Sequence, residues 1–199
     1  MLSELAQRQG EDALALTQAE AAVAICTEVG GRLHLGGALL GLGNAELALG
    51  RYAASASALE RSEAVAREVG DSTGIFNALE AQARLALARG DSPHAQAVVA
   101  RLLTEAGADP AAVVGAPAAG ENDPLGGANA PRVHLTMYQV WARAGDPRAD
   151  AALAEAHRCV QAVADTITDA ALRHGYLNNL AEHREIVALW KARQGSVGR

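Results

Sequence analysis

Glycines recur along the first half of this chain at an interval of twenty residues. The series consists of Gly10, Gly30, Gly50, Gly70 and Gly90. Neighbouring residues repeat as well, since TEVGG at 27–31 is matched by REVGD at 67–71. Glycine ends a helix by taking the left-handed conformation without a steric penalty. A turn residue every twenty positions therefore predicts a series of paired antiparallel helices.

The apolar residues between these glycines have the period of a helix. Residues 51–69 have one apolar face, made of Tyr52, Ser55, Ala56, Leu59, Ser62, Ala66 and Val69. Residues 32–49 have two stripes, one of Leu35, Leu39, Leu42 and Leu49 and the other of Leu33, Leu40 and Leu47. The first pattern predicts an outer helix, and the second predicts an inner helix between neighbours. Half of the chain is hydrophobic but only 3% is aromatic, so the core consists mainly of Ala, Leu and Val in an all-α fold.

Residues 39–62 resemble the tetratricopeptide repeat. The positions that carry the resemblance are Leu39, Leu42, Gly43, Gly50, Tyr52 and Leu59. A second copy over 72–106 keeps Leu79, Ala83, Gly90, Ala95 and Val99. Ser55 and Ser62 stand where the family prefers alanine, and Glu46 and Gln82 stand where it prefers larger apolar residues. The full repeat, a helix pair that spans two glycine intervals, is forty residues long. This length exceeds the usual value of about 34 and is similar to that of long-helix variants in large bacterial regulators. The resemblance implies a right-handed α-solenoid of antiparallel helix hairpins.

The repeat also predicts how the chain is organised. Residues 1–106 are expected to form hairpins, the first one partial because the chain starts in mid-repeat. Such a start favours the C-terminal part of a longer polypeptide, the alternative being a natural N-terminal cap. Residues 107–131 contain four of the six prolines and predict a disordered or functional loop or insertion. In 132–166, ARAGDPRA resembles the earlier ALARGDSPHA and predicts another hairpin that turns at Gly145.

The end of the chain departs from the repeat. Over 167–193 we expect one helix that caps the last hairpin, followed by a disordered tail at 194–199. Its apolar face would consist of Tyr176, Leu180, His183, Val187 and Trp190. This segment resembles the ends of tetratricopeptide regions in large bacterial signalling proteins that carry an ATPase, cyclase or DNA-binding module upstream.

Motifs for catalysis or cofactor binding are missing from the sequence. GGALLGLGNAELALG lacks the Lys-Ser/Thr of a phosphate loop and the third glycine of GxGxxG, so its glycines are interpreted as close-packing positions. The histidines form no HExxH or H-x(3)-H pair, and neither Cys26 nor Cys159 has an evident base or ligand set nearby in the sequence. His183, Arg184 and Glu185 are interpreted as a surface ion pair in preference to a catalytic cluster. We therefore expect no enzyme activity, no cofactor and no metal.

Charge and hydropathy exclude several other classes of partner. The formal net charge of −6 leaves no broad cationic surface for nucleic acid or an anionic membrane. No apolar stretch approaches the roughly 20 residues of a membrane span, and no signal peptide opens the chain. The two cysteines are interpreted as small buried hydrophobic residues in a reducing compartment. These features predict a cytoplasmic location.

The tetratricopeptide resemblance also implies which residues line a concave peptide-binding groove. Carrying the family's groove positions onto this sequence gives Asn44, Asn77, Glu80, Arg84, Arg132, Gln139 and Arg143. Their polar side chains would hydrogen-bond an extended peptide or bind its acidic groups. Leu40 stands where members that bind a free C-terminal carboxylate carry lysine, which argues against that mode. The alternative is a solvated inner face that binds nothing.

Two functional hypotheses follow. The first is a non-catalytic scaffold that mediates protein–protein interaction by binding a protein or peptide segment. The second is a regulatory or sensor region of a larger bacterial ATPase, cyclase or transcription regulator, whose helices contact upstream domains of the same polypeptide or a small effector. The open edge of the first repeat would also permit a homodimer.

Overall fold

The computed structural model describes residues 12–109 and 129–197, and within these ranges the chain has nine helices and no strand. The chain divides into two compact units, residues 1–105 and 106–199. The partial inner helix expected before Gly10, most of the expected 107–131 loop and the last two residues of the expected tail lie outside the described residues.

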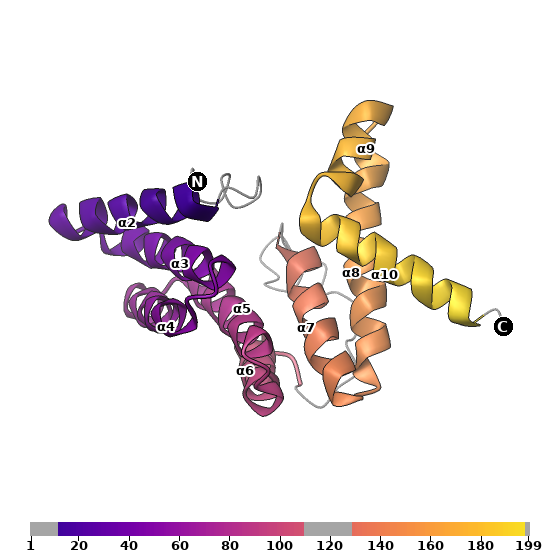
Figure 1. Ribbon diagram of the computed structural model, residues 1–199, viewed down its shortest axis with the longest axis horizontal. Coiled ribbons are helices and arrows are strands. Elements are labelled where there is room, and N and C mark those ends of the chain that lie inside the picture. The colour runs from indigo at the N-terminus through magenta and orange to yellow at the C-terminus, as the bar shows by residue number, and fades with distance from the viewer. Residues whose placement is uncertain (1–11, 110–128, 198–199) are drawn as a thin grey trace. The chain divides into compact units, whose positions relative to one another are not determined.

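Unit 1 is a series of helices joined by short turns (Figure 1). Its helices are α2 (Asp12–Glu28), α3 (Arg32–Ala48), α4 (Tyr52–Val69), α5 (Ser72–Ala88) and α6 (Ser92–Glu105). Each contacts the next along the chain, and α3 also contacts α5. Helices α3 and α5, which α4 separates in the sequence, therefore lie side by side.

Left-handed glycines form the turns of unit 1. The φ angles of Gly30, Gly50, Gly70 and Gly90 are 68°, 73°, 70° and 73°. After each glycine, the next residue donates its N–H to the carbonyl five positions earlier, as in Asp71 N to Ala66 O at 2.9 Å. This bond closes the helix end in a Schellman motif. The glycine turns predicted at these four positions are confirmed.

The twenty-residue interval also governs burial. The residue nine positions after each glycine is at most 1% exposed in all five helices: Ala19, Leu39, Leu59, Leu79 and Val99. Because the turns are equally spaced, the same position of each helix faces the interior.

Helix α3 has apolar contacts on two sides, as its two leucine stripes predict. On one side Leu35 and Leu39 pack with Val65, and on the other Leu40 and Leu47 pack against a cluster that contains Leu59. The ends of the stripes, Leu33 and Leu49, are 58% and 36% exposed because they lie at the helix termini.

Small residues bring α3 and α4 close together. The Ser55 hydroxyl donates to the carbonyl of Gly43, and the Ser62 hydroxyl donates to the carbonyl of Gly36, both at 2.8 Å. Both serines are buried. Serine therefore keeps the side chain small at these positions and adds a hydrogen bond that alanine lacks.

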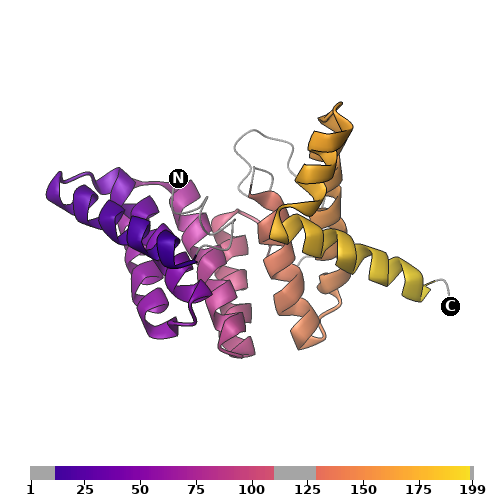
Figure 2. The same cartoon turned by 45° about the horizontal axis from the view of Figure 1, so that its top comes forward.

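The first helices that the structure describes in unit 2 form a hairpin of α7 (Ala130–Ala144) and α8 (Arg148–Thr166), which run side by side in Figures 1 and 2. Gly145 makes the turn with φ 67°, as predicted. Arg148 pairs with Asp146, with Nη2–Oδ2 at 2.6 Å, and lies 4.5 Å from the ring centroid of Trp141. Helix α7 starts at Ala130, two residues before the expected start at 132. It includes Pro131, because proline is tolerated in the first turn of a helix.

The predicted single capping helix over 167–193 is wrong. The segment forms two helices, α9 (Ala170–Asn178) and α10 (Ala181–Val197), so Tyr176 does not share a helix with His183. The break follows two asparagines, which favour helix ends, and new partners satisfy the freed carbonyls. His183 Nδ1 lies 2.9 Å from Tyr176 O, and Arg184 Nη1 donates to Asn178 O at 3.0 Å.

Helix α10 also extends into the expected disordered tail. It continues to Val197, so residues 194–197 are helical. Gly195 lies within this helix and, unlike the glycines at the turns, does not have a positive φ angle. Helix α10 contacts α7, α8 and α9, and its Ile186 is fully buried. Among the helices of the described ranges, none combines the length and apolarity that a membrane crossing requires.

Candidate functional site

Three of the predicted groove residues meet where α3 lies beside α5. Arg84 on α5 donates from Nε to Glu80 Oε1 at 2.8 Å and from Nη2 to Asn44 Oδ1 at 2.7 Å. Asn44 and Arg84 are forty residues apart and so hold the same position in α3 and α5. The guanidinium thereby links α3 to α5 through equivalent residues.

Glu80 differs from the expectation of a groove-facing side chain. It is fully buried, whereas the Arg84 side chain is 29% exposed. The buried carboxylate orients the guanidinium, and Arg84 presents the charge at the surface. Asn77 and Asn44 are half-buried, and Asn77 lies one turn before Glu80 on α5. We call Asn44, Asn77 and Arg84 the α3–α5 polar face.

Leu40, which the resemblance singles out as a leucine in place of lysine, lies in an apolar environment. Leu40 packs against the apolar cluster of Leu59, Ala81 and Leu85. It therefore contributes to the interior of unit 1 and supplies no charge to the polar face.

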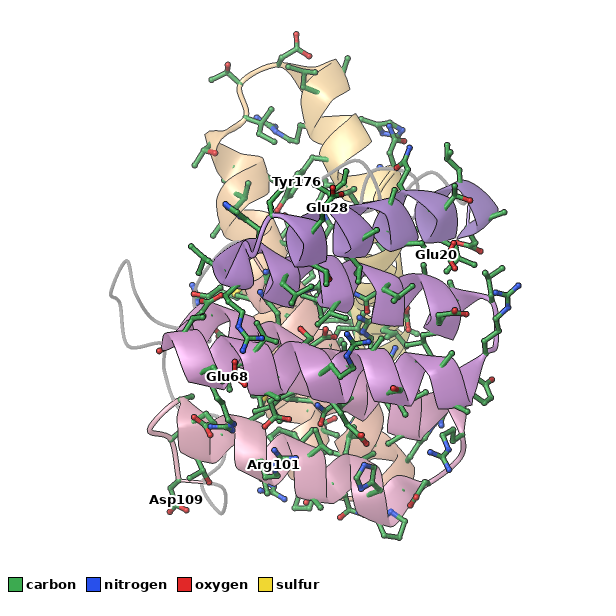
Figure 3. The ribbon with its side chains drawn as sticks, turned by 90° about the vertical axis from the view of Figure 1, so that its left-hand side faces the viewer. Glu20, Glu28, Glu68, Arg101, Asp109 and Tyr176 are labelled. Carbon is green, nitrogen blue, oxygen red and sulfur yellow. The ribbon has the colours of Figure 1, made fainter. Side chains whose placement is uncertain are left out.

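A second polar cluster, which the sequence analysis missed, joins α4, α5 and α6. Glu63 Oε1 accepts from Arg67 at 3.0 Å and from Arg101 at 2.6 Å, and its Oε2 accepts from Gln82 at 2.8 Å. Arg67 also pairs with Glu105 at 2.6 Å. Arg101 is labelled on α6 in Figure 3. This Glu63 cluster explains Gln82, whose buried amide donates to Glu63.

The environment of Glu63 perturbs its ionisation. Burial alone would raise the pKa of this carboxyl, but hydrogen bonds from Gln82 and Arg67 and the charges of Arg101 and Arg67 outweigh it. The resulting pKa of Glu63 lies below its ordinary value. The carboxylate is therefore ionised at neutral pH and acts as a structural anion between three helices.

The remaining predicted groove residues lie on α7 in unit 2. Arg132 and Gln139 are half-buried, and Arg143 is exposed in the last turn. Gln139 Nε2 donates to Glu185 Oε1 on α10 at 2.8 Å. Helix α10 thus covers this face of α7 at its middle. The seven predicted residues therefore fall into two sets, one in each unit.

The surface ion pair expected among His183, Arg184 and Glu185 is wrong. These side chains bind three different partners: a carbonyl of α9 for His183, another for Arg184, and Gln139 for Glu185. His183 is only 6% exposed, and its ring lies 4.4 Å from that of Tyr176. Consecutive residues point in different directions around a helix, so all three serve to dock α10.

A third cluster shows that Cys159, which has no evident base or ligand set nearby in the sequence, has one in the fold. His134 on α7 and Glu155 and Cys159 on α8 each place a nitrogen, oxygen or sulfur within 4.8 Å of the other two. His134 is 2% exposed, whereas Glu155 and Cys159 are half-buried. The Cys159 thiol donates to Glu155 Oε1 at 3.7 Å. We call these three residues the His134 cluster.

Arg158 binds the Glu155 carboxylate of the His134 cluster. Its guanidinium holds both oxygens of Glu155, with Nη2–Oε1 at 2.5 Å and Nε–Oε2 at 2.9 Å. Those hydrogen bonds outweigh burial and keep the pKa of Glu155 below its ordinary value. The i,i+4 spacing of Glu155 and Cys159 was visible in the sequence, but their partner lies on another helix with no spacing signal.

Comparisons with known proteins do not identify the chain, since no family model, curated protein or solved structure matches it.

Proposed function

We propose that helices α2–α6 form a tetratricopeptide-like, right-handed solenoid whose α3–α5 polar face binds an extended peptide. The regular left-handed glycines, the side-by-side placement of α3 and α5 and the equal burial at every twentieth residue support this architecture. On this proposal the chain is a non-catalytic interaction module.

Arg84 is the observation that carries the binding proposal. Its two hydrogen bonds fix the guanidinium, so little side-chain entropy remains to be lost when a ligand binds. Those bonds use Nε and Nη2, which leaves Nη1 as a donor toward a ligand. A fixed, partly exposed guanidinium favours a carboxylate of the peptide. The side-chain amides of Asn44 and Asn77 are suited to hydrogen bonding with the backbone of the bound peptide.

Selection from a random peptide library against the immobilised full chain tests this proposal. The matched variant is Glu80→Gln combined with Arg84→Gln, which removes the cation without leaving a buried unpaired carboxylate. Selected peptides are expected to contain Asp or Glu and to bind the double variant about tenfold more weakly, the value of one charge-assisted hydrogen bond.

Arg89→Gln is the control, since Arg89 is an exposed arginine at the end of the same helix. It should leave peptide affinity unchanged. Failure of the full chain to select any peptide would reject the proposal. So would selected peptides that bind the wild type and the double variant equally well.

A further inference from the structure

We propose that His134, Glu155 and Cys159 bind a zinc ion that joins α7 to α8. The three side chains offer an imidazole nitrogen, a carboxylate oxygen and a thiol sulfur, all within 4.8 Å of one another. They come from two helices that pack along each other. The site is separate from the proposed peptide-binding face, which lies in unit 1.

The donor set selects the metal. Thiolate and imidazole ligands favour zinc over magnesium or calcium, which bind through oxygen. Zinc bonds of about 2.0 to 2.3 Å at tetrahedral angles place ligand atoms roughly 3.3 to 3.8 Å apart. Cys159 Sγ and Glu155 Oε1 are already 3.7 Å apart, and the widest separation in the cluster, at most 4.8 Å, exceeds the required spacing by no more than about 1.5 Å. With three protein ligands, a water molecule completes the tetrahedron.

The positions of the ligands permit an ion to enter. His134 is buried in α7 and supplies a fixed nitrogen. Glu155 and Cys159 are one turn apart on α8 and half-buried, so both lie on one face and remain accessible from solvent. The site thus combines one rigid ligand with two ligands that can adjust.

Zinc binding would deprotonate Cys159, while Arg158 would keep a hydrogen bond to Glu155. The thiol must lose its proton to bind zinc, and that proton passes to solvent. Glu155 Oε1, the oxygen that faces the thiol, would bind the ion. Its Oε2 keeps the hydrogen bond from Arg158 Nε, which is at 2.9 Å. The Arg158 side chain is 51% exposed, so Nη2 can move away from Oε1. The thiolate and carboxylate together neutralise the charge of the ion.

Titration of the full chain with Co²⁺ alone tests the site, because cobalt adopts zinc-like geometry and absorbs visible light. We expect saturation at one ion per chain, tetrahedral d–d bands and a sulfur-to-cobalt charge-transfer band, all lost on adding Zn²⁺. Cys159→Ser should abolish the charge-transfer band. Glu155→Gln should weaken binding by at least about tenfold, as loss of even outer-shell partners does.

Cys26→Ser is the matched control, because Cys26 is half-buried on α2 in unit 1. It should retain the full cobalt spectrum. Far-ultraviolet circular dichroism establishes that each variant is folded, and Cys159→Ser replaces a single atom of a half-buried side chain. Zn²⁺ should raise the melting temperature of the wild type and not of Cys159→Ser. Absence of saturable Co²⁺ binding would overturn the proposal. A charge-transfer band that survives Cys159→Ser or disappears in Cys26→Ser would also overturn it.

Discussion

Gly43 sets the distance between α3 and α4. A Cβ atom at this position would lie 2.5 Å from Leu59 Cδ2 and 2.6 Å from its Cγ, well inside normal contact distance. Leu59 is fully buried and cannot move into solvent. Together with the two serine hydrogen bonds, this contact explains why glycine and serine occupy the interface between these helices.

Gly43→Ala should therefore destabilise the protein. Overpacking of this kind costs about 1 to 3 kcal/mol, which outweighs the gain in helix propensity of about 1 kcal/mol. The control is Gly37→Ala, six residues earlier on the same helix, where an added Cβ meets nothing within 4 Å. That variant should be stabilised by up to about 1 kcal/mol. Urea unfolding followed by circular dichroism measures both, and equal stability of the two variants would contradict the packing argument.

At the level of single residues, the sequence revealed what repeats and missed what depends on distant partners. The turn glycines and the buried leucines follow the twenty-residue interval, so one copy predicts the next. Glu80 and Glu63 lack such a signal. Each is buried because arginines or amides on other turns and helices satisfy it, and these contacts exist only once the helices are packed.

Among the elements, α4, α5 and α6 depend on the Glu63 cluster. Helix α6 reaches α4 through Arg101 to Glu63 and through Glu105 to Arg67, both at 2.6 Å. Arg67 and Arg101 are 42% and 49% exposed, so solvent screens part of these attractions. The hydrogen bond between Glu63 and Gln82 is buried and is screened less.

The depressed pKa of Glu63 makes this cluster sensitive to acid. Because its pKa is lower in the folded than in the unfolded chain, its stabilising effect is fully present above the unfolded value of about 4.3. The effect is lost as pH falls through the folded pKa. Glu63→Gln should lower the free energy of unfolding at pH 7 by about 1 to 3 kcal/mol. Because the variant lacks this carboxylate, its free energy of unfolding should fall less on acidification than that of the wild type.

Glu60→Gln provides the comparison, since Glu60 is exposed on the same helix. Urea unfolding from neutral pH to below pH 4 should show a smaller pH dependence for Glu63→Gln than for the wild type or Glu60→Gln. If all three proteins lose stability in parallel, the Glu63 cluster is not the source of acid sensitivity.

In unit 2, the sequence pattern predicted one helix hairpin but not the break in the last segment. The hairpin of α7 and α8 was predicted from its resemblance to an earlier turn, and its Gly145 adopts the expected conformation. The division of the last segment into α9 and α10 was not predicted from the sequence. The apolar spacing continues through the break, so it gave no sign of a helix end. The break lies at Asn178 and Asn179, and the side chains of His183 and Arg184 bind the carbonyls that it frees at the end of α9.

On the scale of the whole molecule, each unit has its own apolar core. Unit 1 contains the clusters around Leu39 and Leu59, and unit 2 contains the cluster of Leu135, Ala156, Val160 and Ile186. A unit with its own core is able to fold by itself. We therefore expect the two units to unfold in separate transitions.

The tryptophans allow these transitions to be distinguished. Both Trp141 and Trp190 belong to unit 2, so tryptophan fluorescence reports unit 2, whereas circular dichroism reports both units. Leu153→Ala, at a position 1% exposed in α8, should cost unit 2 about 2 to 5 kcal/mol and lower the urea midpoint seen by fluorescence. Gly43→Ala should leave that midpoint unchanged while it shifts part of the dichroism transition. A common shift of both signals in either variant would instead show that the two cores unfold as one, because in a single cooperative transition every probe must move together.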